Sequence, residues 1–187
     1  MTWRAGLRAW RAHDDPAAAT ANFIALLVGW NGPFYPLYLL ALVGRHAGPA
    51  APLTLFATPL FLALPWLSRR SSQAGRFGLV LVGTLNTLWC MKLMGPGSGV
   101  ALFLLPCIAL AALLFRRREQ AAMLVAAVLP AAGYFVPASV LGAPLMRLSA
   151  PELSRLYALN AGSVLMLMLV LAVQFALLLR RMAGVTL

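Results

Sequence analysis

Acidic side chains are almost absent from this sequence, which has 4 Asp and Glu residues and 2 histidines in 187 positions. The four acids, Asp14, Asp15, Glu119 and Glu152, lie at the borders of long apolar stretches and not inside them. The apolar stretches therefore contain no carboxylate for a proton relay. The chain also offers no nucleophile beside a base and no metal-ligand spacing of Cys and His. These shortages predict a protein that is not an enzyme and has no metal site.

Charge of either sign is scarce as well. Only 10% of the residues are charged and 62% are hydrophobic, whereas soluble domains average about 25% charged and 45–50% apolar residues. Cys90 and Cys107 both lie in apolar stretches, which suits small buried side chains better than a disulfide. A soluble fold of this size has too much surface to hide so much apolar area. The composition therefore predicts an integral membrane protein.

Six apolar stretches are long enough to cross a bilayer, since a spanning helix needs about 17–25 residues. They cover residues 19–43, 51–68, 77–95, 99–115, 120–142 and 156–179. Backbone groups in hydrocarbon must pair within their own segment, so each stretch is expected to be helical. The predicted fold class is all-α: a polytopic membrane protein with six transmembrane helices in one bundle, forming a single membrane domain over 1–187.

The cations are distributed unevenly between the two sides of this arrangement. Eleven lie before the first stretch, in alternate connections and after the last: Arg4, Arg8, Arg11, Arg69, Arg70, Arg76, Arg116, Arg117, Arg118, Arg180 and Arg181. Four lie on the other side: Arg45, Lys92, Arg147 and Arg155. Cytoplasmic loops carry the excess of Lys and Arg, so both termini are predicted to be cytoplasmic. Residues 1–18 are expected to form an amphipathic segment on the inner membrane surface.

The net charge of +11 raises the question of nucleic acid, which clustered cations bind. Here the arginines form short groups between apolar stretches, and we expect them to contact anionic lipid headgroups instead. The Ala-, Leu- and Arg-rich composition is typical of a bacterium with GC-rich DNA. The predicted location is therefore a bacterial inner (cytoplasmic) membrane, with no nucleic acid as partner.

The first stretch contains the most specific local pattern, two prolines three residues apart. Pro33 and Pro36 remove helical hydrogen bonds and either kink the helix or open it. If the helix opens, Asn31 and Tyr35 beside the break become candidates for a ligand or ion site. The alternative is a packing kink, because Pro is frequent in membrane helices.

Three further polar residues lie at a similar depth, Asn86 and Lys92 in the third stretch and Asn160 in the sixth. If these helices are neighbours, all three could join Asn31 and Tyr35 around one outward-opening polar cavity. Each has a simpler alternative. An Asn often bonds a neighbouring helix, and a Lys near a helix end can extend to the headgroups.

Ala158 and Gly162 are four positions apart, the spacing at which small residues allow helices to approach closely. This pair is the predicted helix-contact surface. The contact could be with another helix of the same bundle or with a partner.

The stretch from Gly95 to Glu119 reads Gly-Pro-Gly-Ser-Gly-Val-Ala-Leu-Phe-Leu-Leu-Pro and later Leu-Leu-Phe-Arg-Arg-Arg-Glu. It resembles the six-helix membrane sensor regions that precede bacterial nucleotide cyclases and histidine kinases. The resemblance implies a signal-input role with an output domain after the sixth helix. This sequence ends at Leu187 without such a domain, so we expect any output to pass through another polypeptide.

The function expected from these features is that of a non-catalytic protein acting through partner membrane proteins or a second copy of itself. It would be an accessory subunit of a larger membrane complex or a signal-input module. The alternative is a small carrier or channel for a neutral or anionic solute, built on the first helix broken by Pro and Gly. The sequence assigns no cofactor.

Overall fold

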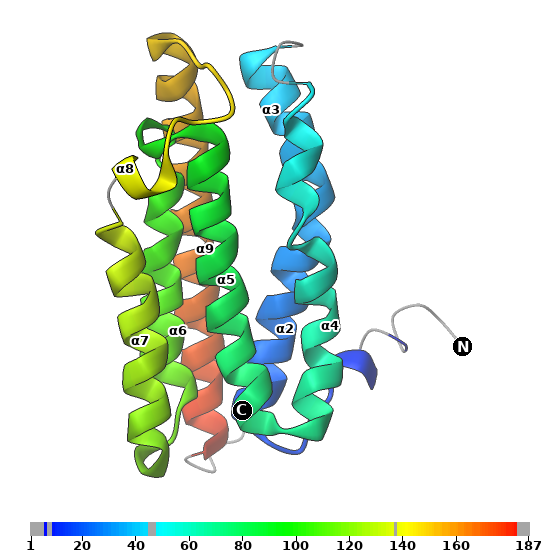
Figure 1. The fold of residues 1–187 in the computed structure, drawn as a ribbon. Coiled ribbons are helices and arrows are strands. Elements are labelled where there is room, and N and C mark those ends of the chain that lie inside the picture. The colour runs from blue at the N-terminus through cyan, green and yellow to red at the C-terminus, as the bar shows by residue number, and fades with distance from the viewer. Residues whose placement is uncertain (1–5, 7–8, 45–47, 137, 183–187) are drawn as a thin grey trace.

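The computed structural model describes residues 6, 9–44, 48–136 and 138–182 (Figure 1). Over these residues the chain is helical and has no strand. The predicted all-α class is therefore confirmed for the described part of the chain. Arg4, Arg8 and Arg45, and most of the N-terminal amphipathic segment before residue 9, lie outside it.

The first long helical segment runs without interruption from Pro16 to Val43. It consists of α2 (Pro16–Asn31), a 3-10 turn η1 (Gly32–Phe34) and α3 (Tyr35–Val43). The segment begins where the Asp15 carboxylate accepts a hydrogen bond from the Ala17 N–H at 3.0 Å. Because Pro33 and Pro36 have no N–H, the α-helical pattern cannot continue, and the tighter 3-10 turn replaces it.

The remaining elements follow in chain order. They are η3 (Ala51–Leu55), α4 (Thr58–Arg70), α5 (Ser72–Met94), η4 (Pro96–Ser98), η5 (Val100–Phe103), α6 (Leu104–Leu114), η6 (Arg117–Glu119), α7 (Gln120–Tyr134), α8 (Ala138–Leu141) and α9 (Ala150–Met182).

Four helical segments in the described residues are long and apolar enough to cross a membrane. They are Pro16–Val43, Ala51–Arg70, Ser72–Met94 and Ala150–Arg180. The helix over Val100–Leu114 is apolar but shorter, and α7 has 15 residues. The structure therefore shows an all-helical protein with several helices suited to a membrane.

Several helix ends differ from the predicted ranges, and two of them have a local cause. The helix expected over 120–142 ends at Tyr134, because Pro137 disfavours helical backbone at the residue before it. The last helix begins at Ala150 and not near 156. At its start the Glu152 carboxylate accepts the Ser149 N–H at 2.7 Å, and this cap allows the helix to begin earlier than hydrophobicity alone predicts.

The helical segments lie roughly side by side, with α2, α3 and α4 on one flank and α5, α6, α7 and α9 on the other (Figure 1). Glycines bring α2 and α4 close together. A Cβ atom at Gly29 would lie 3.0 Å from the Leu62 Cδ2 atom, and one at Gly32 would overlap the Thr58 hydroxyl. Two groups of buried apolar side chains follow the bundle axis, one around Ile24 and Leu79 and the other around Leu39 and Met94.

The bundle has two chemically different ends. Connections between α4 and α5 and between α6 and α7 meet the start of α2 at one end, which we call the arginine end (Figure 1). Its described cations are Arg11, Arg69, Arg70, Arg76, Arg116, Arg117, Arg118 and Arg180. The other end, called the opposite end, contains the connections after α3, α5 and α7, with Lys92, Arg147 and Arg155.

Candidate functional site: a cavity between the helices

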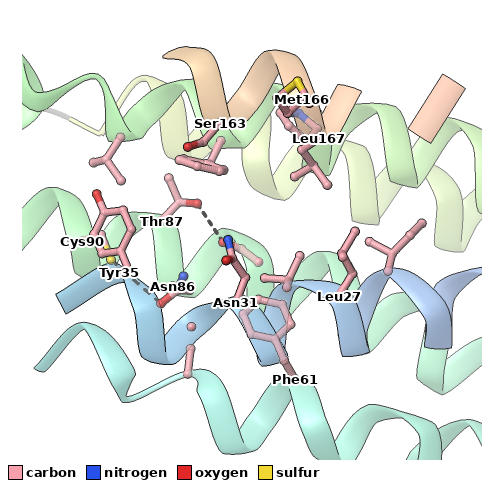
Figure 2. Close-up of a pocket in the computed structure, with 18 of the residues that line it drawn as sticks. Leu27, Asn31, Tyr35, Phe61, Asn86, Thr87, Cys90, Ser163, Met166 and Leu167 are labelled. Atoms are coloured by element: carbon pink, nitrogen blue, oxygen red, sulfur yellow. Dashed lines mark hydrogen bonds between the residues drawn. The ribbon is translucent and has the colours of Figure 1, made fainter. Parts of the chain in front are cut away.

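A cavity of about 870 Å³ lies in the middle of the bundle, between the α2–α3 segment, α4, α5, α6 and α9 (Figure 2). We call it the central cavity. Most of its walls are aliphatic and aromatic side chains, and none of the residues that line it is Asp, Glu, Lys, Arg or His. The polar groups that line it are neutral: amides, hydroxyls and thiols.

Asn31 and Asn86 both line the central cavity, from the last turn of α2 and from the middle of α5 (Figure 2). The Asn86 Oδ1 atom accepts the Cys90 thiol at 3.9 Å. Within the described residues no hydrogen-bond partner is found for the Asn86 amide N–H groups or for any atom of the Asn31 amide. Both amides are therefore available to a molecule in the cavity.

Tyr35 also lines the cavity, but its hydroxyl is already bonded. It donates to the Asn160 Oδ1 atom at 2.8 Å, and the Asn160 amide nitrogen donates to the Ser98 carbonyl at 2.9 Å. Asn160 is completely buried. The pair ties α3 to α9 and η4, so Asn160 supports the cavity wall and does not line the cavity.

Lys92 lies away from the cavity, at the opposite end of the bundle. Its ammonium group donates to the Ala143 carbonyl at 2.8 Å, and its own carbonyl accepts the Leu145 N–H at 3.1 Å. Lys92 therefore holds the connection between α7 and α9 against the end of α5. Of the five polar residues singled out from the sequence, the structure brings Asn31, Tyr35 and Asn86 together at the cavity.

Ala158 and Gly162 line the cavity from α9. A Cβ atom added at Gly162 would meet no heavy atom within 4 Å. Gly162 therefore makes no close contact with another helix of the bundle. A contact of the pair with a partner stays a prediction. The small side chains of the pair leave space beside α9.

Sequence reasoning overlooked an ion cluster at the arginine end, formed by Asp15, Arg76, Arg116 and Glu119. Arg76 was expected to be one of several loop cations, yet it is 1% exposed. Its guanidinium donates twice to the Glu119 carboxylate, at 2.8 Å each, and lies 3.7 Å from Asp15. Arg116 pairs with Asp15 at 3.1 Å. The sequence did contain one signal of this cluster, the scarcity of acidic residues. Each of these carboxylates lies where a cation can neutralise its charge.

The ion cluster shifts both of its carboxyl groups towards the charged form. Hydrogen bonds from Arg76 lower the pKa of Glu119 below its usual value, outweighing the opposing effect of burial. Burial acts to raise the pKa of Asp15, but hydrogen bonds from Ser72, Ala17 and Arg116, together with the charge of Arg76, lower it overall. The cluster joins the ends of α2, α5 and α6 through charges that cancel.

No protein-family model, curated protein or solved structure matches the chain significantly. Within the described residues, no group of three or more His, Cys, Asp or Glu side chains is placed to hold a metal ion. The central cavity is therefore the candidate site on its own physical features.

Proposed function

We propose that this chain is a non-catalytic integral membrane protein that binds a small, uncharged and mostly apolar molecule in the central cavity. The observation that carries the proposal is a cavity of about 870 Å³ whose lining has free amide groups and no charge. Ligand sites in proteins measure about 300–1,000 Å³ and combine apolar walls with a few polar groups that orient the ligand. The lack of cations in the lining favours a neutral ligand over an anionic one.

In this proposal the chain crosses the bilayer six times, through the four long helical segments and the shorter α6 and α7, with both termini cytoplasmic. The gathering of arginines at one end of the bundle supports this orientation through the positive-inside rule. The hydrogen bonds from Arg76 to Glu119 support a full crossing by α6 and α7, because they hold the connection between these helices level with the start of α5. At 1.5 Å per residue the 15 residues of α7 extend roughly 22 Å, a mismatch that local thinning of the bilayer accommodates.

The proposed role is to report the bound molecule to partner membrane proteins or to a second copy of this chain, as a signal-input module or accessory subunit of a bacterial inner-membrane complex. Exposed apolar side chains on α9, including Leu165 and Leu169, offer a face for such a partner. The second candidate is a carrier for the same neutral molecule. The 3-10 turn η1 favours it, because an irregular helix beside a binding site is a feature of membrane transporters.

Binding is tested with a neutral apolar fluorophore, N-phenyl-1-naphthylamine, added to the purified protein in lipid nanodiscs. We expect a saturable rise in fluorescence above that of empty nanodiscs. Leu167→Trp places a larger side chain in the cavity and should weaken the saturable part. Leu165→Trp is the matched control, since Leu165 is 71% exposed and does not line the cavity. Equal binding by the two variants would contradict the proposal.

A carrier is distinguished from a reporter by the same molecule in liposomes. The carrier predicts that reconstituted protein speeds transfer of the fluorophore between the leaflets. The reporter predicts unchanged transfer and partner chains that co-purify with the protein in mild detergent.

A further inference from the structure

Most polar groups of the central cavity lie in one half of it. On the α2–α3 segment the lining residues nearer the opposite end include Asn31, Tyr35 and Tyr38, whereas those nearer the arginine end are Ile24, Leu27 and Val28. Along η3 and α4 the lining changes in the same direction, from Thr54 and Thr58 to Phe61. On both helical segments the lining therefore changes from polar to apolar at a similar level of the bundle.

Helix α5 repeats this division, and α9 is consistent with it. From the opposite end inwards, α5 contributes Cys90, Thr87 and Asn86 before Gly83 and Leu79. The one polar side chain that α9 contributes, Ser163, follows Ala158, Leu159 and Gly162 and precedes Met166, Leu167 and Val170. Helix α6 is mostly apolar along its length, with Cys107 as its one polar contribution. The cavity thus has a polar half toward the opposite end and an apolar half toward the arginine end.

The central cavity is long and reaches the side of the bundle. Its lining on α9 extends from Ala158 to Val170, which at 1.5 Å per residue is roughly 18 Å. Two of the lining side chains, Trp30 on α2 and Met166 on α9, are 68% and 64% exposed. Both helices are long and apolar enough to span a membrane, so this opening faces lipid. A molecule dissolved in the bilayer can enter there without passing through water.

We infer that the ligand is an uncharged amphiphile with a single apolar chain, an inference that rests on the proposed function. Its hydroxyl- or amide-bearing head lies between Asn31 and Asn86, whose amides have no other partner for their N–H groups among the described residues. Its chain lies along Met166, Leu167 and Val170 toward the arginine end. A charged head is excluded by the lining, because an ion held there would lose its hydration without gaining a counter-charge.

The test uses two photoreactive monoacylglycerols and the wild-type protein in zwitterionic nanodiscs. One probe has its diazirine at the end of the chain and the other has it next to the glycerol. We expect the chain-end probe to label α9 around Met166–Val170 and α6 near Leu110, and the glycerol-end probe to label α2 and α5 around Asn31 and Asn86. Labelled peptides are identified by mass spectrometry, with Leu167→Trp, which narrows the apolar half of the cavity, as the control.

The outcomes of this experiment distinguish the proposed function, binding in the central cavity, from the inferred amphiphilic ligand. Absence of cavity labelling by either probe, together with absence of fluorophore binding, contradicts the proposed function itself. Fluorophore binding with reversed or mixed labelling positions retains the proposed function and overturns the inferred amphiphile. A fatty acid of equal chain length, in its ionised form, should compete poorly, and competition equal to that of the monoacylglycerol overturns the uncharged head.

The head contacts are tested by the double substitution Asn31→Leu and Asn86→Leu. Loss of two hydrogen bonds should weaken monoacylglycerol binding about tenfold. Binding of the fluorophore, which has no glycerol head, should change little and reports that the variant is folded. Equal affinity of the variant and the wild type for the monoacylglycerol contradicts the assigned head position.

Discussion

At the scale of single residues, the space around a glycine decides its role and its spacing in the sequence does not. Ala158 and Gly162 have the spacing of a close helix contact, yet a Cβ atom at Gly162 meets no neighbour within 4 Å. Gly29 and Gly32 lack that spacing and hold α2 against α4. Spacing shows which residues share a helix face, but only the packed structure shows what that face meets.

The two glycines provide a matched pair of substitutions. Gly32→Val forces a side chain into Thr58 and should lower the free energy of unfolding by about 1–3 kcal/mol, the usual cost of overpacking. Gly162→Val enters open space and should leave stability within about 0.5 kcal/mol of wild type. Thermal unfolding in mild detergent measures both. A larger loss for Gly162→Val than for Gly32→Val would contradict this packing.

The hydrogen bond from Tyr35 to Asn160 gives a second prediction at this scale. Tyr35→Phe removes the only donor to the buried Asn160 Oδ1 atom among the described residues, and should cost about 1 kcal/mol of stability. Tyr38→Phe is the control, because Tyr38 is 45% exposed and its hydroxyl has no partner among the described residues. Equal unfolding midpoints for the two variants would show that the Tyr35 bond contributes nothing.

At the scale of helices, apolar length alone predicted most of the fold. Residues 77–95 were expected to form one helix and lie within α5 except for Gly95. The errors fall at helix ends, where local signals act: Pro137 follows the early end of α7, and Glu152 caps an early start of α9. Hydrophobicity varies too gradually along the chain to locate such ends.

The site was predicted in part, and for a similar reason. Depth along each helix follows from the sequence, so Asn31, Tyr35 and Asn86 were expected at one level. The rotation of each helix about its axis does not follow from a sequence that is apolar on every face. Asn160 therefore turned out to be buried in the wall and Lys92 to bind a loop. The apolar half of the cavity had no sequence signal, because its side chains resemble those that face lipid.

The ion cluster at the arginine end ties several helices together, and the pair of Glu119 with buried Arg76 is its most direct link to test. Glu119→Gln keeps the size of the side chain but removes the charge that faces buried Arg76. Breaking a buried pair costs about 3–5 kcal/mol, and Asp15 near Arg76 should keep the loss at the lower end of this range. Arg118→Gln, an exposed neighbour, is the control for thermal unfolding. A loss of stability no larger than that of the control would show that the cluster does not stabilise the fold.

The same cluster predicts how stability depends on pH. Folding lowers the pKa of both Asp15 and Glu119, so the unfolded chain binds more protons in acid than the folded chain does. The stabilisation is present above their ordinary values near pH 4 and is lost as pH falls through the lower folded values. The unfolding midpoint should therefore drop between about pH 5 and pH 3, and less steeply in Glu119→Gln. A midpoint that rises with acidification would contradict the assigned shifts.

At the scale of the whole molecule, the position of the central cavity inside the bilayer depends on how many times the chain crosses it. Four segments have the length and composition of spanning helices, and α6 and α7 are shorter. If α6 and α7 entered and left the bilayer on the side of the opposite end, the connection between them would not reach the arginine end. The ion cluster instead places this connection beside the starts of α2 and α5.

One labelling experiment tests this central claim most directly. Arg117 is exposed in that connection, and Gly97 is exposed in the connection after α5. In a background with Cys90 and Cys107 replaced by Ala, Arg117→Cys should react with a membrane-impermeant maleimide only in inside-out vesicles. Gly97→Cys should react only in intact cells. Labelling of both cysteines from the same side would contradict the six-crossing bundle. Labelling of Arg117→Cys from outside intact cells would contradict the cytoplasmic assignment of the arginine end.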